Sequence, residues 1–314
     1  MTDAGRIPDL AERLTVAICT FRRPALAAAL QSLQEQDADG LPWSVLVVDN
    51  DDVPSAQATV ERARSLTGLD IAYRHVPGRN IAIARNGCLD HAQGRWLVFM
   101  DDDEIAPRGW LAALVRERFQ PCAAVFGPVR ALYEPDQPRW MRLGDFHSFT
   151  VVRVRGRILS GYTANVLIDR THPAVAQRQF DVALGRSGGE DSDYFSAVSA
   201  AGGQLGYAPE AVMEERVVAE RANLRWLLVR RFRMGQTHGR TLRRQGRSRS
   251  GVAAMAAAKL TVCMLGALIC VLSAPHWRGW LQRGALHAGV LAHMFGGADL
   301  VLYGQGAPST ARES

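Results

Sequence analysis

Short apolar runs alternate with amphipathic stretches along the first 130 residues of the chain. Four of the runs predict strands, and the first two are as apolar as strands buried on both faces of a sheet are. They lie at 14–20, 44–48, 71–76 and 96–100. Prolines stand near the start of several intervening segments, a position that suits the first turn of a helix. The segments predict helices at 24–36, from 54 onward, at 81–92 and at 107–119, and another strand follows at 123–130.

This alternation predicts an α/β fold. Strands that alternate with helices of this length form a mostly parallel central sheet covered by helices on both faces. In such sheets, ligands bind beyond the carboxyl ends of the strands. Polar residues follow three of the predicted strands, namely Thr20, Asp49 and the acidic run 101–103. We therefore expect these residues to meet at one edge of the sheet, and their convergence carries more weight than any single motif.

The second half of the chain has a different pattern. Residues 133–161 are rich in Pro, Trp and Arg and break the alternation, and a strand is then predicted at 164–168. A glycine-rich lead precedes a helix predicted at 190–201. Residues 222–245 predict a basic helix. The most apolar segment of the chain, 252–274, follows it and ends before a proline.

Composition excludes several classes of protein. The 314 residues are 47% hydrophobic and 22% charged, which argues for a globular protein and against a disordered or polytopic one. Lys259 is the single lysine, so a Schiff-base or P-loop lysine has almost nowhere to stand. The five cysteines form no CxxC pair and indicate buried thiols in a reducing compartment. The N-terminus lacks the pattern of a secretory signal, so we expect a cytoplasmic protein.

Two acidic groups are candidates for chemistry. Asp101 and Asp103 stand two positions apart, and such a pair on a turn can hold a hard divalent cation that neutralises a departing diphosphate. Glu190 and Asp191 follow two glycines, where a carboxylate could accept the proton of an attacking sugar hydroxyl. Each group could instead be a solvated acidic turn or the first turn of a helix. Alignment with the other strand ends favours the cation site.

Five motifs follow one another along the chain. They are LTVAICTFRRP, VLVVDN, GRNIAIARN, WLVFMDDDE and GGEDSDYF, and the resemblance that they carry covers about residues 14–240. In this order and spacing the chain resembles a family 2 glycosyltransferase of the GT-A fold. Within that family it is similar to the non-processive, succinoglycan-type enzymes of bacterial exopolysaccharide assembly. Each motif alone is modestly specific, and the five in register are highly specific.

The resemblance implies a role for each matching residue in binding a nucleotide sugar. Asp49 would accept a hydrogen bond from the base, which is most commonly uracil in this family. Asp103 would ligate Mn²⁺ or Mg²⁺ directly, and Asp101 would contact the ribose or a metal-bound water. The implied nucleotide-sugar-binding residues are Thr20, Phe21, Arg23, Asp49, Arg79, Asn80, Arg85, Asp101 and Asp102.

The resemblance also implies the catalytic groups. Asp191 would be the base, and Glu190 would orient the acceptor, in a single displacement that inverts the anomeric centre. Asn165 and Trp140 are candidates for contact with the acceptor. The Gln-x-x-Arg-Trp signature of processive polymerases is missing, since 223–226 only partly matches it, so we expect transfer of a single sugar. Glu214 and Glu215 stand where many relatives place a histidine ligand, and His238 lies too far along the chain to be assigned as a ligand.

A basic region precedes the apolar segment. Residues 221–249 contain ten arginines and no acidic residue, and such a run binds either RNA or anionic lipid. The adjoining apolar segment favours lipid, because it is about long enough to cross a hydrocarbon core of roughly 30 Å. We therefore expect association with the cytoplasmic face of the plasma membrane, where the segment either crosses or lies on the bilayer. Trp277 and Trp280 suit an interfacial segment, although a buried C-terminal helix is an alternative.

These patterns together give a division of the chain and a function. We expect transfer from a nucleotide sugar, with UDP as the expected nucleotide, to a lipid-linked saccharide, with no nucleic-acid partner. The alternatives are a membrane- or RNA-associated scaffold and a sugar-1-phosphate nucleotidyltransferase, and the latter would need a Gly-rich loop after the first strand. No GxGxxG follows a predicted strand, which argues against a dehydrogenase. The expected segments are a polar lead at 1–13, a GT-A domain at 14–220 (nucleotide-binding half 14–130, acceptor half 131–220), a basic helix at 221–250, membrane-associated helices at 251–303 and a tail at 304–314.

Overall fold

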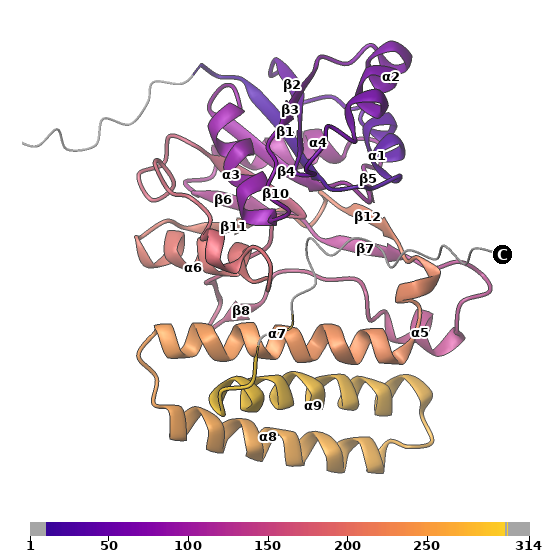
Figure 1. Ribbon diagram of the computed structural model, residues 1–314, viewed down its shortest axis with the longest axis vertical. Coiled ribbons are helices and arrows are strands. Elements are labelled where there is room, and N and C mark those ends of the chain that lie inside the picture. Colours follow the sequence, from indigo (N-terminus) through magenta and orange to yellow (C-terminus); the bar gives the residue numbers. More distant parts are fainter. Residues whose placement is uncertain (1–10, 299, 301–314) are drawn as a thin grey trace, which may run out of the picture. The chain divides into compact units, whose positions relative to one another are not determined.

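The computed structural model describes residues 11–298 and residue 300 (Figure 1). Its chain divides into two compact units. Among the described residues, the first unit comprises 11–129 and 150–214, and the second comprises 130–149, 215–298 and 300. Most of the predicted lead at 1–13 and all of the predicted tail at 304–314 lie outside the described residues. The predicted domain boundaries stay a prediction.

A mostly parallel sheet forms the centre of the first unit, as the sequence predicts. Its strands run in the order β11-β6-β10-β4-β1-β2-β3. All neighbouring pairs are parallel except those of β10, which is antiparallel to both β4 and β6. The strands are β1 (Leu14–Thr20), β2 (Trp43–Asp49), β3 (Ile71–His75), β4 (Trp96–Asp101), β6 (Ala124–Phe126), β10 (Asn165–Asp169) and β11 (Leu205–Tyr207).

The apolar runs form these strands because both faces of the sheet are covered. Val16, Ala17 and Ile18 are consecutive residues of β1, and none of them is exposed to solvent. Residues of α3 and α6 pack in one apolar core with alternate residues of β1, β2 and β4. The helices of this unit are α1 (Leu26–Ser32), α2 (Gln57–Thr67), α3 (Ile81–His91), α4 (Trp110–Arg116) and α6 (Glu190–Ala200), with short 3-10 turns at Glu117–Phe119 and Val182–Leu184.

The single strand predicted at 123–130 is wrong. The structure has two strands there, β6 and β7 (Val129–Leu132), separated by Gly127 and Pro128. A proline has no backbone N–H to donate to a neighbouring strand. At Gly127 the chain passes so close to the carbonyl oxygen of Ala211 that a Cβ atom would lie 2.2 Å from it. The short remaining strands are β5 (Glu104–Ile105), β8 (Arg153–Val154), β9 (Arg157–Ile158) and β12 (Met213–Arg216), and β8 and β9 form a hairpin.

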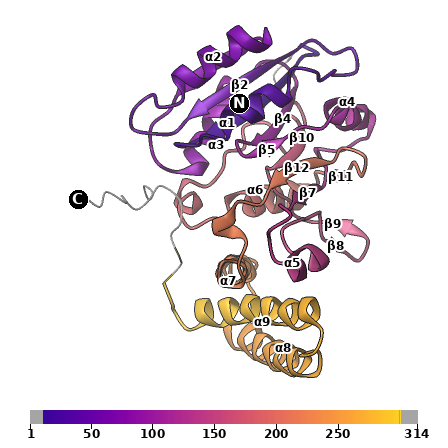
Figure 2. The same cartoon turned by 90° about the vertical axis from the view of Figure 1, so that its right-hand side faces the viewer.

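Long helices dominate the second unit. The predicted basic helix is α7 (Leu224–Arg244), and its first turn is capped by the side chain of Asn223. Helices α8 (Arg249–Ile269) and α9 (Ala274–Met294) follow, and α9 packs along both α7 and α8 (Figure 1 and Figure 2). The predicted apolar segment at 252–274 is therefore offset from α8, and Pro275 stands in the first turn of α9. The unit also contains α5 (Arg139–Gly144) and a 3-10 turn at Ala219–Arg221.

Helix α8 differs from the other helices in its exposure. Within the described part of the chain it alone is long and apolar enough to cross a membrane, with a mean hydropathy of 2.0 over its most apolar window. A core helix of a soluble protein also passes such a test when it is buried. In α8, however, only 17% of that window is buried. Its apolar surface is therefore left largely uncovered within this chain.

Candidate active site

The polar ends of three strands lie side by side. Thr20 at the end of β1 pairs in register with Asp49 at the end of β2. On the other side, Cys19 of β1 pairs in register with Asp101 at the end of β4. These strands are parallel, so their carboxyl ends reach the same edge of the sheet. The structure thus brings together the three strand ends that the sequence singles out.

A buried carboxylate connects two of these ends. Thr20 Oγ1 donates a 2.7 Å hydrogen bond to Asp102 Oδ2. Arg23 lies beside the same acidic run, with Nε 3.8 Å from Asp102 Oδ1 and Nη2 3.9 Å from Asp103 Oδ2. Burial, together with the neighbouring charge of Asp103, raises the pKa of the Asp102 carboxyl to about 7. The run therefore gathers three adjacent carboxyl groups, and Arg23 lies within 4.0 Å of two of them.

Arg85 connects the acidic run to the second acidic group. This arginine stands on α3, is 7% exposed and forms an ion pair with Glu190 Oε1 at the start of α6. Its Nη2 atom lies 4.0 Å from Asp101 Oδ1. Burial lowers the pKa of the Arg85 guanidinium, but the charges of Glu190 and Asp191 outweigh this effect and raise it above its usual value. Arg85 thus holds the end of β4 and the start of α6 in one charged cluster.

Asp191 stands next to Glu190 and differs from it in exposure. Glu190 is 3% exposed, whereas Asp191 is partly exposed and accepts a 2.6 Å hydrogen bond from the backbone N–H of Ser192. The two glycines before α6 have φ of 86° and 93°, a region that favours glycine. The glycine lead therefore turns the chain so that two adjacent carboxylates begin the helix.

Asp49 is completely buried, and its oxygens already accept hydrogen bonds from the protein. Oδ1 accepts from the backbone N–H of Asp51 at 3.1 Å. Oδ2 accepts from the backbone N–H of Ala56 and from the hydroxyl of Tyr73, both at 2.8 Å. The structure thus gives Asp49 a part in shaping the loop after β2. Its contact with a base stays a prediction.

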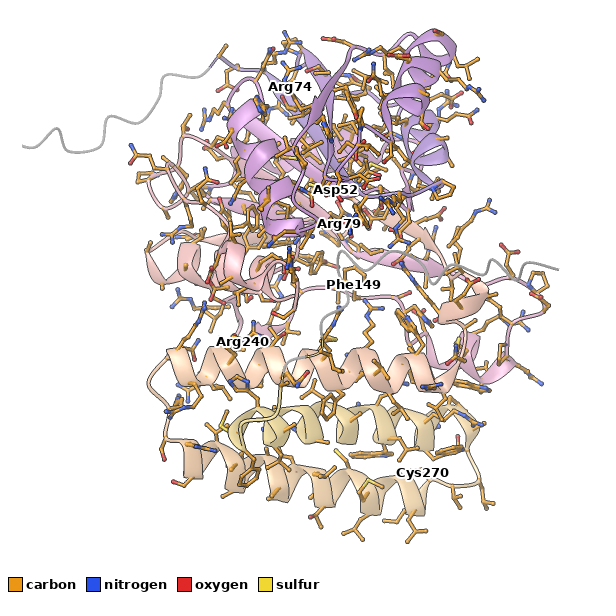
Figure 3. The ribbon with its side chains drawn as sticks, in the orientation of Figure 1. Asp52, Arg74, Arg79, Phe149, Arg240 and Cys270 are labelled. Atoms are coloured by element: carbon orange, nitrogen blue, oxygen red, sulfur yellow. The ribbon has the colours of Figure 1, made fainter. Side chains whose placement is uncertain are left out.

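Two further predicted residues order the start of α3. Asn80 caps this helix, and its Oδ1 accepts from the backbone N–H groups of Ala82 and Ile83. Its Nδ2 donates to the carbonyl oxygen of Val182 at 2.9 Å. Arg79, with a φ of 47°, forms an ion pair with Asp52, and the two lie together in Figure 3. Phe21, directly after β1, packs against the guanidinium of Arg22.

The two acceptor candidates lie in different units. Asn165 is fully buried on β10, where its Oδ1 accepts from Trp110 Nε1 at 3.0 Å and its Nδ2 donates to two backbone carbonyls. Trp140, on α5, packs against Phe146 and lies under the guanidinium of Arg278, 4.5 Å from the ring centroid. Both side chains thus have structural contacts, and their roles toward an acceptor stay predictions.

The residues at the end of β4 fit a divalent cation that is shared with a phosphate ligand. Across 11–298, no three His, Cys, Asp or Glu side chains are grouped so that they could hold a metal by themselves. Mg²⁺ and Mn²⁺ are commonly held by one or two carboxylates, while water and substrate phosphates fill the other positions. Asp101 and Asp103 offer two such carboxylates, with side chains 46% and 20% exposed. Between them in the sequence stands Asp102, whose carboxyl has a raised pKa chiefly because it is buried.

Sequence reasoning missed two features of this region. Arg22 donates to both carboxylate oxygens of Asp51, at 2.7 and 2.9 Å, and this pairing lowers the pKa of Asp51 to about 2. Glu104, which is 1% exposed, accepts from the backbone N–H of Asp101 at 2.8 Å and so fixes the turn after β4. Glu104 belongs to the DDDE motif, and its place there was a signal that could have identified it.

The chain is similar in sequence to known glycosyltransferases. A model of glycosyl transferase family 2 matches residues 15–182. The chain is 43% identical over 302 residues to the succinoglycan biosynthesis protein ExoM of Rhizobium meliloti (strain 1021). The aligned region covers 95% of this chain and 98% of that protein. It is also 30% identical over 121 residues, 37% of each chain, to a GalNAc(5)-diNAcBac-PP-undecaprenol beta-1,3-glucosyltransferase of Campylobacter jejuni subsp. jejuni serotype O:2 (strain ATCC 700819 / NCTC 11168).

Solved structures share the fold. The mannosyltransferase PcManGT from Pyrobaculum calidifontis, solved with GDP-Man and Mn²⁺, is 19% identical, with a TM-score of 0.61 over 93% of this chain and 90% of that one. GalNAc-T7, solved with UDP, GalNAc and Mn²⁺, is 13% identical, with a TM-score of 0.51 over 69% of this chain and 46% of that one. At these identities the likeness establishes the GT-A fold alone.

Proposed function

The chain belongs to glycosyltransferase family 2, and from this premise we propose that it transfers a single sugar from a UDP-sugar to a saccharide hydroxyl, with inversion at the anomeric carbon. The observation that carries the proposal is the charged cluster around Arg85. It joins the acidic end of β4, where a donor diphosphate would sit, to the acidic start of α6, where an acceptor would lose its proton. A displacement at the anomeric carbon needs the groups that hold the departing diphosphate and the base that activates the acceptor to lie close to that one carbon.

At the donor end, Asp101 and Asp103 would hold Mn²⁺ or Mg²⁺. When bound, such a cation neutralises the charge that develops on the departing diphosphate. Arg23 lies within 4.0 Å of the acidic run, and its guanidinium fork suits phosphate oxygens. Thr20 holds Asp102 in place through its hydroxyl, and this bond keeps the acidic turn fixed against β1.

At the acceptor end, exposure supports Asp191 as the base. A base must reach the hydroxyl whose proton it accepts, and Asp191 is partly exposed. Glu190 is buried in its ion pair with Arg85, so it acts by positioning the first turn of α6 and the neighbouring base. The proton therefore goes from the acceptor hydroxyl to Asp191 as the new glycosidic bond forms.

The acceptor that we propose is a lipid-linked saccharide in exopolysaccharide assembly. The Campylobacter relative carries a diphosphate-linked undecaprenol in its name, and the Rhizobium relative is named for succinoglycan biosynthesis. The exposed apolar helix α8 supports a place at the membrane, which we propose to be the cytoplasmic face. The missing Gln-x-x-Arg-Trp signature supports the addition of one sugar at a time.

Two variants and a control test the reaction. We expect Asp103→Asn to lose the Mn²⁺-dependent part of UDP binding, as measured by calorimetric titration. We expect Asp191→Asn to keep that binding and to lower kcat by roughly 10²–10⁴-fold, the usual contribution of a general base. Asp37→Asn removes an exposed carboxylate of the same unit and should change neither quantity. Release of nucleotide from a panel of UDP-, GDP- and dTDP-sugars identifies the donor, and unchanged UDP binding in Asp103→Asn would refute the metal assignment.

A further inference from the structure

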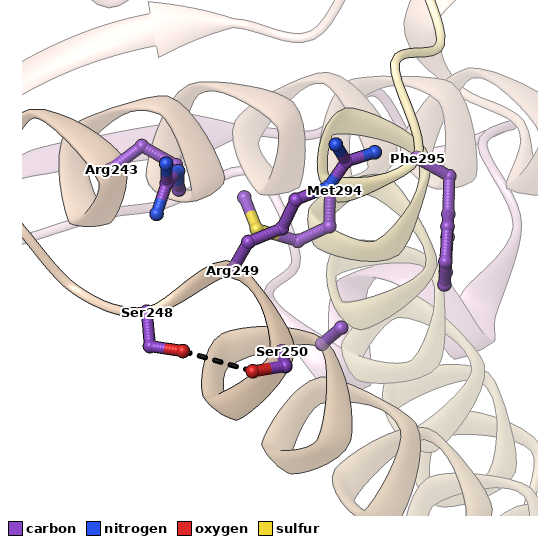
Figure 4. A pocket seen from close by; sticks show the side chains of 7 residues that line it. Arg243, Ser248, Arg249, Ser250, Met294 and Phe295 are labelled. Carbon is purple, nitrogen blue, oxygen red and sulfur yellow. Dashed lines mark hydrogen bonds between the residues drawn. The ribbon is translucent and has the colours of Figure 1, made fainter.

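A cavity of about 560 Å³ is lined by residues of the second unit (Figure 4). The charged cluster around Arg85 belongs to the first unit. It is formed where α7 ends, α8 begins and α9 ends. Two arginines and two serines supply its polar lining, and Met294 and Phe295 supply an apolar side. The lining residues are Arg243, Ser248, Arg249, Ser250, Ala253, Met294 and Phe295.

The polar lining of this corner suits a phosphate. Guanidinium groups bind phosphate oxygens through paired N–H donors, and serine hydroxyls add further donors. Ser248 and Ser250 already share a hydrogen bond of 3.0 Å at the entrance of α8. No acidic residue occurs between residues 221 and 298, so this stretch of the chain supplies no carboxylate to neutralise the two arginines. The corner therefore favours an anion.

An apolar surface begins beside this corner. Met255, Val262, Leu265 and Ile269 recur at helical spacing along α8 and are 59%, 58%, 55% and 82% exposed. Phe295, on the rim of the cavity, is 74% exposed. A helix of 21 residues is roughly 31 Å long, so the apolar stripe extends far beyond the cavity. A soluble anion or an RNA would leave this stripe in water, whereas a lipid would cover it.

We propose that this corner, formed by Arg243, Ser248, Arg249 and Ser250, binds the phosphodiester headgroup of an anionic phospholipid while α8 lies among the acyl chains of one leaflet. The proposal rests on the membrane location given under Proposed function and adds the ligand and the orientation. Lys259, in the middle of α8, is exposed, and a helix that crossed the bilayer would place its charge in the hydrocarbon core. A helix that lies along the surface lets this side chain reach the headgroups.

Flotation with vesicles tests the headgroup site. We expect the full-length protein to bind vesicles that contain phosphatidylglycerol more tightly than vesicles of phosphatidylcholine alone. Arg243→Gln/Arg249→Gln should weaken binding to the anionic vesicles roughly 25-fold, since each arginine near such a surface contributes about a factor of five. The matched control is Arg142→Gln/Arg225→Gln, which removes two exposed arginines of the same unit that do not line the cavity. We expect that control to change binding by less than about twofold.

Several outcomes would overturn the proposal. Equal losses in the two double variants would mean that charge acts diffusely and that the cavity holds no headgroup. Equal binding of the wild type to both kinds of vesicle would exclude anionic recognition. Inorganic phosphate that binds the protein as tightly as the anionic vesicles do, or RNA whose binding depends on Arg243 and Arg249, would assign the corner to a soluble ligand.

The apolar half of the proposal has its own variant. Leu265→Gln/Ile269→Gln should weaken binding to both kinds of vesicle, because it removes apolar surface and no charge. Far-ultraviolet circular dichroism should show that each variant keeps the helical content of the wild type. Undiminished binding by this pair would place α8 outside the bilayer. All binding is measured without a nucleotide sugar, so a failed transfer reaction would leave these results unaffected.

Discussion

At the scale of single residues, Arg85 shows how a buried charge is kept. Arg85 is 7% exposed, and its guanidinium is stabilised by Glu190 and Asp101, which come from two other elements. Removing one partner of a buried ion pair usually costs about 3–5 kcal/mol, because the remaining charge stays buried without its counterion. The cluster is therefore sensitive to the loss of either partner, whatever the intact pair contributes.

This sensitivity gives a stability prediction. We expect Arg85→Met to lower the free energy of unfolding of the first unit by about 3 kcal/mol, as measured by denaturant titration. Arg85→Met/Glu190→Gln should recover much of this loss, since it also removes the buried negative charge of Glu190. It should not recover transfer activity. Arg74→Met changes an exposed arginine of the same unit and should stay within about 0.5 kcal/mol of the wild type. A double variant no more stable than Arg85→Met would contradict this explanation.

His147 gives a prediction on pH. His147 is 4% exposed, and its ring stacks on Trp226. Nε2 donates to the carbonyl oxygen of Arg221, and Nδ1 lies 3.1 Å from the hydroxyl of Tyr133. Burial lowers the pKa of His147 to about 4, below the value of about 6.5 in an unfolded chain. Between these pH values the unfolded chain binds a proton that the folded chain does not. This contribution to stability is therefore complete above pH of about 6.5 and decreases as the pH falls toward 4.

We expect denaturant titrations to report this decrease as a loss on the order of 3 kcal/mol between pH of about 7 and about 4. His147→Gln should be less stable than the wild type at neutral pH, because it loses the stacked ring. Its stability should nevertheless fall less steeply with acid. An equally steep fall in His147→Gln would show that other groups cause the acid sensitivity.

The sequence predicts single positions better than pairs. Thr20, Asp49 and Asp101 were expected at one sheet edge, because each follows an apolar run, and the strand register confirms that edge. The ion pair between Arg85 and Glu190 could not be predicted, since it joins residues 105 positions apart on two helices whose approach depends on the whole fold. The hydrogen bonds that Asp49 accepts could not be predicted either, because their donors lie in a loop and on a neighbouring strand.

At the scale of elements, two glycines allow α7 and α9 to pack closely. A Cβ atom on Gly289 would lie 1.9 Å from the carbonyl oxygen of Phe232, and one on Gly235 would lie 1.9 Å from that of Leu286. Backbone atoms of a helix cannot move aside as the end of a side chain can. Each helix therefore presents a glycine to the backbone of the other.

We expect Gly289→Val to destabilise the helical unit by about 3 kcal/mol or more, since it overpacks a backbone contact. Gly284→Ala provides the matched control on the same helix. Its added Cβ would meet Leu260 at an ordinary distance of 3.4 Å, and alanine favours a helix by up to about 1 kcal/mol over glycine. Thermal unfolding followed by circular dichroism measures both. A Gly289→Val protein that is as stable as the Gly284→Ala protein would disprove the close packing.

Elements differ in how well their sequence predicts them. The strand predicted at 14–20 has the bounds of β1, because an apolar run between polar residues has clear ends. The apolar segment was expected to continue to Pro275, whereas α8 ends at Ile269 and the proline stands in the first turn of the next helix, a position that suits it. Between α8 and α9 the apolar residues continue through the turn, so hydropathy alone does not mark the helix end at Ile269.

At the scale of the whole molecule, charge is divided unevenly along the chain. Thirteen of the 37 basic residues and none of the 31 acidic residues lie in 221–298, so the rest of the chain has a net charge of −7. The acidic remainder includes the strand ends of the charged cluster. A single net charge of +6 therefore misrepresents both parts, and it would have suggested a nucleic-acid partner. The positions of the basic residues along the chain, rather than their total, indicate which segment would attract an anionic partner.

Two compact units also imply two unfolding steps. The first unit has a large apolar core beneath its sheet, whereas the buried apolar cluster between α8 and α9 consists of Ala256, Val290 and Met294. Little buried apolar surface means little resistance to unfolding, so we expect the helical unit to melt first in calorimetry.

UDP with Mn²⁺ should raise only the upper transition, because a ligand stabilises the unit that binds it. The stabilisation is about 2.7 kcal/mol at a concentration one hundred times its Kd. Gly289→Val should lower only the lower transition. A single transition that both changes shift would mean that the units unfold together, and an upper transition unmoved by UDP would place the nucleotide elsewhere than at the sheet edge.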